Sequence, residues 1–407
     1  MSNTEVISFS FCQISDLNLD SSAALNLHLS PVQRKQRNEE AIEAFASAMK
    51  MASSDDVNAV LVPGNLFDAE NITTQAVARV QRIFAMLQEI PVYIAPGSLD
   101  PLFNDSLYDE SALRAHGLPP WSENVHIFSS NSVRTFSLPG KSSVKVSGIG
   151  LTKEGRRNTP VIPPLAEADK VAINILLLPL GLVDAKSGVL DADLSDTING
   201  LGYSYVALSG FKNGVALNSR DNVICAAAAG TFIGQTEREL GPRHALFLNL
   251  DRRIGGGMEL TVRPEEFDPR RIVSCNFDIS GKEPSQLSRL LRASIANSDA
   301  RQGKDIMVLH LNGNYPSGSE LELASEASKL DFFHLKLSDD TRPDYLETMS
   351  NRNMIEVQFI GLMEDLRAKA TAEGGLKQTE KMRVINDALY YGLEAIREGK
   401  VTIRHAD

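Results

Sequence analysis

Apolar and polar residues alternate in blocks along the first hundred residues, and these blocks predict strands and helices in turn. Buried strands are expected at 6–14, 57–63 and 91–97, and helices at 37–52 and 73–90. Each strand is a short apolar run that ends in turn residues, whereas the helical segments carry apolar side chains three and four residues apart. The order strand, helix, strand, helix, strand predicts an α/β fold with a parallel sheet and crossover helices.

The later part of the chain predicts further strands and then a change in character. Strands are expected at 144–151, 171–179, 203–210, 222–226, 244–250 and 258–262, after a stretch rich in loops at 101–140. Near Asp268 the pattern becomes that of a small α+β domain with a helix at 285–296, and from about Asn351 it is helical, with the linker TAEGGLKQ between two helices. The expected domains are therefore 1–266, 267–345 and 346–407.

Composition is that of an ordinary globular protein. The chain is 43% hydrophobic and 23% charged, with a net charge of −11, so no overall basic field attracts nucleic acid or anionic membranes. The three cysteines are far apart and are expected to be reduced. The first residues lack the features of a signal peptide, and the longest apolar run, Val171–Val183, is too short to cross a bilayer. A cytoplasmic protein is expected.

Polar residues gather where the predicted parallel strands end, which is the edge at which open α/β sheets bind ligands. In chain order these residues are Asp16, Asn18, Gly64, Asn65, Asp68, Gly97, Ser98, Leu99, Asp100, Pro179, Gly210 and Lys212. Because these strand ends share one region of the fold, we expect the residues to lie close together.

Three sequence segments that contain strand ends resemble the calcineurin-like metallophosphoesterases, and in particular the SbcD-type DNA repair exonucleases. The segments are NAVLVPGNLFD, IPVYIAPGSLDP and YSYVALSGFKNG. In the family, the strand ends read Asp-x-His, Gly-Asp-x-x-Asp, Gly-Asn-His-Asp and Gly-His-x-His. The resemblance implies a four-layer αββα core, a small α+β capping domain and C-terminal helices that contact a coiled-coil, SMC-like ATPase. It also implies a homodimer and two divalent metals, usually manganese.

Seven positions hold the two metals in that family, and this chain keeps one of the seven residues. The positions are Asp16, Asn18, Asn65, Ser98, Pro179, Gly210 and Lys212, of which Asp16 is the family residue. Asn65 replaces the aspartate that bridges the metals, and a neutral amide cannot balance two dications. Lys212 places a cation where a ligand is expected, which repels a metal. Leu99 replaces the histidine that assists the leaving group.

These losses predict a protein that keeps the frame of a hydrolase without its chemistry. Two-metal hydrolysis needs both ions to activate water and to stabilise the attacking and leaving oxygens. We therefore expect no catalytic residue and no metal cofactor. If any metal remains, its ligands are expected to be Asp16, Asn18 and Asn65.

The surviving charged residues are expected to have structural roles. Asp68 and Asp100 are predicted to hold loops together by hydrogen bonds. Lys212 is predicted to pair with the Asp16 carboxylate, so that protein charge replaces metal charge. On the C-terminal helices, an apolar stripe is expected to pack on its own domain, with a partner groove as the alternative; it consists of Ile355, Phe359, Leu362, Met363 and Leu366.

Three functional hypotheses follow. The first is a catalytically inactive SbcD-like protein that acts as a scaffold or DNA-binding subunit in DNA repair, with an SMC-like ATPase. The second is an active metal-dependent exonuclease or phosphoesterase with rearranged ligands. The third is a nucleotide or small-molecule binder that uses the vacated cleft.

Overall fold

The computed structural model describes most of the chain, which divides into two compact units, Met1–Ile272 and Val273–Asp407. The described residues are 6–21, 27–153, 162–166, 172–183, 192–218, 224–253, 257–316, 321, 323–344, 354–373 and 376–401. The expected domain boundary between 345 and 346 lies outside them. Within these ranges, no helix is long and apolar enough to cross a membrane.

A six-stranded sheet in the order β12-β11-β1-β2-β3-β4 forms one half of the first unit. Its strands are β1 (Val6–Gln13), β2 (Ala59–Val62), β3 (Val92–Ile94), β4 (Val125–Ile127), β11 (His244–Arg253) and β12 (Met258–Glu266). The strands β1 to β4 run parallel, whereas β11 is antiparallel to β1 and β12 is antiparallel to β11. The loops that follow β1, β2 and β3 therefore emerge at the same edge of the sheet.

A second six-stranded sheet has the order β5-β6-β7-β8-β10-β9. Its strands are β5 (Arg134–Leu138), β6 (Lys141–Gly148), β7 (Ile173–Val183), β8 (Tyr205–Phe211), β9 (Val215–Asn218) and β10 (Ile224–Ala228). The inner strands β6, β7, β8 and β10 are parallel, and the edge strands β5 and β9 are antiparallel to their neighbours.

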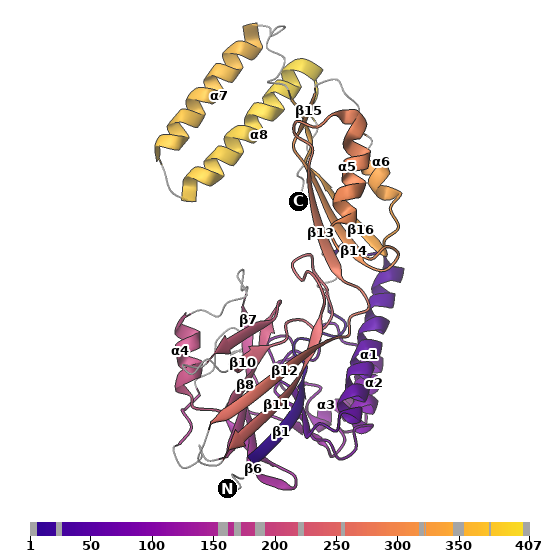
Figure 1. The fold of residues 1–407 in the computed structure, drawn as a ribbon, viewed down its shortest axis with the longest axis vertical. Helices are drawn as coiled ribbons and strands as arrows, with labels where there is room; N and C mark the ends of the chain where they lie inside the picture. Colours follow the sequence, from indigo (N-terminus) through magenta and orange to yellow (C-terminus); the bar gives the residue numbers. More distant parts are fainter. Residues whose placement is uncertain are drawn as a thin grey trace, which may run out of the picture. The chain divides into compact units, whose positions relative to one another are not determined.

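The two sheets pack face to face, and helices cover their outer faces (Figure 1). Phe11 and Tyr93 from the first sheet meet Ile175 from the second in the core between the sheets. The first sheet is covered by α1 (Pro31–Ser54), α2 (Thr74–Ala85) and α3 (Glu110–Ala115), and the second by α4 (Ala192–Gly200). This order of layers confirms the four-layer αββα core expected from the sequence.

Helix α1 begins six residues before its predicted start because of local capping. The Ser30 hydroxyl accepts a hydrogen bond from the Gln33 N–H, the Gln33 side chain accepts from the Ser30 N–H, and Pro31 is the first helical residue. Further along, buried Arg37 donates to both carboxylate oxygens of Asp268 at 2.9 Å and to the Gly234 carbonyl at 3.0 Å. The ion pair fastens α1 to the segment that follows β12, and the hydrogen bond to Gly234 fastens it to the loop that precedes β11.

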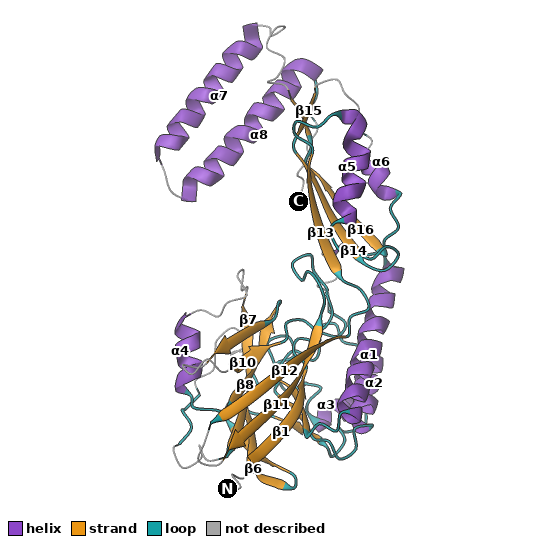
Figure 2. Cartoon of the chain, viewed as in Figure 1, coloured by secondary structure: helices purple, strands orange, loops and turns teal. Residues whose placement is uncertain are grey.

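The second unit contains a three-stranded sheet, a two-stranded sheet and helices (Figure 2). Its elements are β13 (Ile272–Asp278), α5 (Pro284–Ala296), β14 (Ile306–Asn312), β15 (Asn314–Pro316), α6 (Leu323–Ser328), β16 (His334–Asp339), β17 (Arg342–Asp344), α7 (Met354–Glu373) and α8 (Leu376–Glu398). The order of the larger sheet is β13-β14-β16, and its core includes side chains of α5 and α6. Helices α7 and α8 share a small core of their own.

Several short elements escape prediction from the sequence. The stretch 101–140, expected to be loop-rich, contains α3, β4 and β5, and the sequence pattern predicts neither β9 nor α4. β4 is three residues long and only partly buried, so it has little apolar signal. The expected linker TAEGGLKQ is also too long, because α7 extends to Glu373 and α8 begins at Leu376.

The apolar stripe on α7 divides between two faces of the helix. Met363 is 5% exposed, and Phe359 is partly buried against the α7–α8 core. By contrast, Ile355, Leu362 and Leu366 are exposed to 65%, 58% and 39%. The expectation that the whole stripe packs on its own domain is therefore wrong for these three residues.

Candidate functional site

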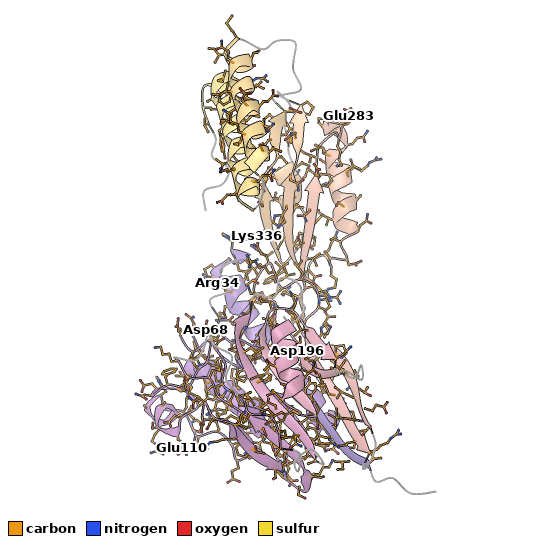
Figure 3. The ribbon with its side chains drawn as sticks, turned by 90° about the vertical axis from the view of Figure 1, so that its left-hand side faces the viewer. Arg34, Asp68, Glu110, Asp196, Glu283 and Lys336 are labelled. Atoms are coloured by element: carbon orange, nitrogen blue, oxygen red, sulfur yellow. The ribbon has the colours of Figure 1, made fainter. Side chains whose placement is uncertain are left out.

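The loops after β1 and β2 are joined to each other at the carboxyl edge of the first sheet. The Asp16 N–H donates to the Gly64 carbonyl at 3.3 Å, and the Asn18 N–H donates to the Asn65 carbonyl at 2.9 Å. Asp68, which ends the loop after β2, is labelled in Figure 3. The predicted clustering of polar residues at this edge thus brings together Asp16, Asn18 and Asn65.

The Asp16 carboxylate is buried, and the groups that donate hydrogen bonds to it are neutral. It is 2% exposed and accepts hydrogen bonds from the Gly210 N–H at 3.0 and 2.9 Å and from Asn65 Nδ2 at 2.6 Å. Gly210 belongs to β8, so both sheets contribute to the site. Burial raises the pKa of Asp16 to about 7, although the hydrogen bonds from Asn65 and Gly210 act in the opposite direction.

Asn65 connects Asp16 to the loop after β3. Its Nδ2 donates to Asp16, while its Oδ1 accepts from the Leu99 N–H at 2.9 Å and from the Ser98 hydroxyl at 3.5 Å. The residue is completely buried. An aspartate here could accept from Leu99 but, when ionised, could not donate to Asp16. We call this connection, from Gly210 through Asp16 and Asn65 to Leu99, the Asp16–Asn65 bridge.

The predicted ion pair between Lys212 and Asp16 is not formed. The Asp16 carboxylate is held by Asn65 and Gly210, and its pKa is raised, whereas a neighbouring ammonium would lower it. Lys212 is half-buried, and its backbone carbonyl accepts hydrogen bonds from Arg243 Nη1 at 2.8 Å and from the Thr231 N–H at 3.2 Å. The backbone N–H of Gly210 in β8 therefore lies against the Asp16 carboxylate, where the sequence predicts the Lys212 ammonium group.

Asp100 is a buried carboxylate with five hydrogen bonds. Its Oδ1 accepts from the N–H groups of Gly97 and Asn65 at 2.6 and 3.2 Å, and its Oδ2 from those of Leu66 and Phe67 at 2.7 and 3.2 Å. The Tyr108 hydroxyl donates to the same Oδ2 at 2.5 Å. Burial raises the pKa of Asp100, and these hydrogen bonds oppose the change. Sequence reasoning missed Tyr108, because no motif joins it to Asp100.

The other predicted positions make local contacts at this edge. Asp68 accepts from the Glu70 N–H at 3.2 Å and from Asn71 Nδ2 at 3.0 Å. Asn18 is 6% exposed, and its Oδ1 has no hydrogen-bond partner among the described residues. Pro179 is buried, and Leu99 enters the network through its backbone N–H.

The backbone at this edge is held in an unusual conformation. Asp16, Asn18 and Asn65 have φ angles of 51°, 48° and 55°, in the left-handed region that Asn and Asp tolerate better than most residues. Such residues cost about 1–3 kcal/mol each. Gly97 is required by close approach, since a Cβ there would lie 2.3 Å from Asn65 Oδ1. The loops are thus held tightly in one arrangement.

The side chains at this edge do not fit the two manganese ions that the resemblance implies. Among the residues that the structure describes, no group of three or more His, Cys, Asp or Glu side chains could hold a metal ion. Both Asp16 oxygens already accept hydrogen bonds, and Asn65 turns its Nδ2 donor toward Asp16. Burial of Asp16, Asn65 and Ser98 also leaves a ligand little access to their side chains.

Comparison with known proteins gives structural similarity alone. No protein-family model matches the sequence, and no curated protein matches it. The chain is similar to the crystal structure of TT1561 of Thermus thermophilus, with 13% identity and a TM-score of 0.33, over 63% of this chain and 99% of that chain. It is also similar to a dimetal phosphatase from Danio rerio, with 10% identity and a TM-score of 0.36, over 62% and 98% of the two chains. At these values the similarity says nothing of this chain's chemistry.

Proposed function

We propose that this protein is a catalytically inactive, SbcD-like homologue that acts as a scaffold or DNA-binding subunit in DNA processing, works with an SMC-like ATPase and forms a homodimer. The observation that carries the absence of catalysis is the 2.6 Å hydrogen bond from Asn65 Nδ2 to Asp16. It places a donor at the position where a shared metal would need an acceptor. The fold is phosphoesterase-like, and protein hydrogen bonds close the edge at which the resemblance places the metals.

The alternative of an active enzyme with rearranged ligands has less support. A divalent cation needs several oxygen or nitrogen ligands, and a pair of cations needs a negatively charged group between them. The two carboxylates beside Asn65 are both already occupied as acceptors. Asp16 accepts from Asn65 and Gly210, and Asp100 accepts from four backbone N–H groups and Tyr108.

We expect the purified protein to show no saturable Mn²⁺ binding and no Mn²⁺-dependent hydrolysis of bis(p-nitrophenyl) phosphate or linear DNA. Chelator-treated full-length protein would be titrated with Mn²⁺ by calorimetry, and hydrolysis would be compared with that of Asp16→Ala prepared in parallel. Equal background rates of hydrolysis for the native protein and Asp16→Ala, with no saturable heat of Mn²⁺ binding, support the proposal. Manganese-dependent hydrolysis that disappears in a folded Asp16→Ala variant would establish an active enzyme instead.

The exposed side chains of α7 support a coiled-coil partner. Ile355, Leu362 and Leu366 follow one another at intervals of seven and four residues, which places them on one face of the helix. We propose that this face, which we call the α7 seam, packs against the coiled coil of the SMC-like ATPase.

Replacing Leu362 by glutamate is expected to weaken that association by about tenfold or more, because the charge would be desolvated within an apolar contact. Val384→Glu on α8 is the matched control, since Val384 is also exposed, at 62%, and lies outside the α7 seam. Affinity for the coiled-coil segment of the ATPase from the same organism would be measured by calorimetry. Equal weakening by both variants would contradict the α7 seam as the binding face.

A further inference from the structure

A cavity of about 260 Å³ opens in the first unit beside the loops after β2 and β3. Phe67 and Asp100 form part of its wall, whereas Asp16 and Asn65 do not line it. The cavity is therefore separate from the Asp16–Asn65 bridge, and neither the resemblance nor the proposed function assigns it a role. Its volume is slightly below that of pockets for drug-sized ligands, which suits a single fused-ring base.

Aromatic side chains form the walls of this cavity. Phe67 is 1% exposed, Tyr108 is 8% exposed, and Phe103 is 40% exposed. The hydrogen bond from the Tyr108 hydroxyl to Asp100 fixes the orientation of the tyrosine ring. Trp121, the single tryptophan of the chain, stacks on the far side, with its ring centroid 6.2 Å from those of Phe67 and Tyr108. Aromatic rings therefore line the cavity, which suits a flat ring as the ligand.

Polar groups around the cavity leave hydrogen-bonding capacity for a ligand. Asp105 and His116 line it, and both residues are exposed. Within the described ranges, neither side chain has a hydrogen-bond or ion-pair partner. Ser106 and Thr74 add hydroxyl groups to the lining. Outside the cavity, Lys153 Nζ lies 5.9 Å from the centroid of the Phe103 ring, so an ammonium group stands beside the aromatic wall.

We propose that this cavity binds a guanine mononucleotide. The base would stack against Phe103 and contact Phe67 and Tyr108, since every base offers a π-face to aromatic side chains. The two oxygens of the Asp105 carboxylate would accept from N1–H and the exocyclic amino group of guanine, which are adjacent donors on one edge. Adenine lacks that pair of donors. The Lys153 ammonium would face the phosphate.

Intrinsic fluorescence provides the test, because Trp121 lies directly behind the cavity wall. The full-length protein would be titrated with guanosine 5′-monophosphate (GMP), adenosine 5′-monophosphate (AMP) and ribose 5-phosphate, with calorimetry as an independent readout. Saturable binding is expected for GMP, binding about tenfold or more weaker for AMP, and none for ribose 5-phosphate.

Two substitutions locate the site. Phe103→Ala is expected to weaken GMP binding by about tenfold or more, whereas Met86→Ala, at a residue 66% exposed elsewhere on the surface, is not. Asp105→Asn is expected to abolish the preference for GMP over AMP, and Asp56→Asn is its matched control. Both altered residues are exposed, so the variants are expected to fold.

The absence of saturable GMP binding, or GMP binding unchanged by Phe103→Ala, would overturn the proposal. Equal affinity for GMP and AMP would overturn the assignment of guanine. These outcomes are independent of the proposed scaffold role, because the cavity contains no residue of the Asp16–Asn65 bridge and no residue of the α7 seam.

Discussion

Replacing Asp100 by alanine is expected to destabilise the first unit by about 5 kcal/mol or more, which is comparable to the whole stability of a typical domain. The substitution leaves four backbone N–H groups and the Tyr108 hydroxyl without an acceptor in a buried region. Each unpaired buried donor costs about 1–3 kcal/mol. Urea denaturation followed by Trp121 fluorescence would measure the loss, and a variant that fails to fold would be the extreme form of the expected result.

Asp68→Ala is the control for that measurement, because Asp68 ends the same loop and its side chain accepts hydrogen bonds from Glu70 and Asn71, its near neighbours in the chain. We expect it to cost about 1–2 kcal/mol. Tyr108→Phe, which removes one donor and keeps the ring, is expected to cost about 1 kcal/mol. If Asp100→Ala proved no more harmful than Asp68→Ala, the Asp100 network would not be what holds these loops.

Replacing Asn65 by aspartate, which restores the bridging residue of active metallophosphoesterases, is expected to destabilise this protein at pH 8 by about 3–5 kcal/mol. In the native protein Asn65 Nδ2 lies 2.6 Å from the Asp16 carboxylate. The variant would place two carboxylates at that distance in a buried site, so the pair could not ionise fully without strong repulsion. Denaturation with urea at several pH values is the measurement.

The pH dependence has a definite sign. The folded-state pKa of Asp16 is raised from 3.8 to about 7, so burial favours its protonated form. Its contribution to stability is therefore fully present below about pH 4 and is lost as the pH rises toward 7. In Asn65→Asp the loss should be larger and should continue above pH 7, whereas at pH 5 a shared proton should restore most of the bridge.

Exchanging the two residues separates charge from shape. In Asp16→Asn combined with Asn65→Asp, one amide and one carboxylate again face each other, and we expect at least half of the lost stability to return at pH 8. Asp16→Asn alone should show a flatter pH profile than the native protein. If Mn²⁺ rescued Asn65→Asp as well as the second substitution does, a metal site would survive, and the proposal of a metal-free scaffold would fail.

Much of the fold could be predicted from the sequence, because the buried strands are apolar runs between turns. β1, β2 and β3 alternate with amphipathic helices, and this pattern predicts their parallel order. The edge strands β4 and β9 could not be predicted in the same way. Each is three or four residues long and partly exposed, so side-chain periodicity carries little information.

The position of the site could be predicted from the sequence, but the hydrogen bonds between its residues could not. The sequence brings Asp16 and Asn65 to one edge because both follow parallel strands. It does not reveal that a backbone N–H of β8 reaches Asp16, since every residue except proline offers that donor. The prediction for Lys212 failed for this reason. Opposite charge suggested Lys212 as the partner of Asp16, whereas the Gly210 N–H of β8 lies close enough to donate to that carboxylate.

The position of β1 has a consequence for how the protein is made. β1 precedes β2 and β11 in the chain, and it lies inside the sheet between them, with Val6 opposite Arg253. A nascent chain that ends before β11 leaves one edge of β1 unpaired, with Phe9 and Phe11 on that strand. Pairings so distant in sequence form slowly. The first unit should therefore complete its folding only after nearly all of it has left the ribosome, and until then it would benefit from a chaperone that shields this edge.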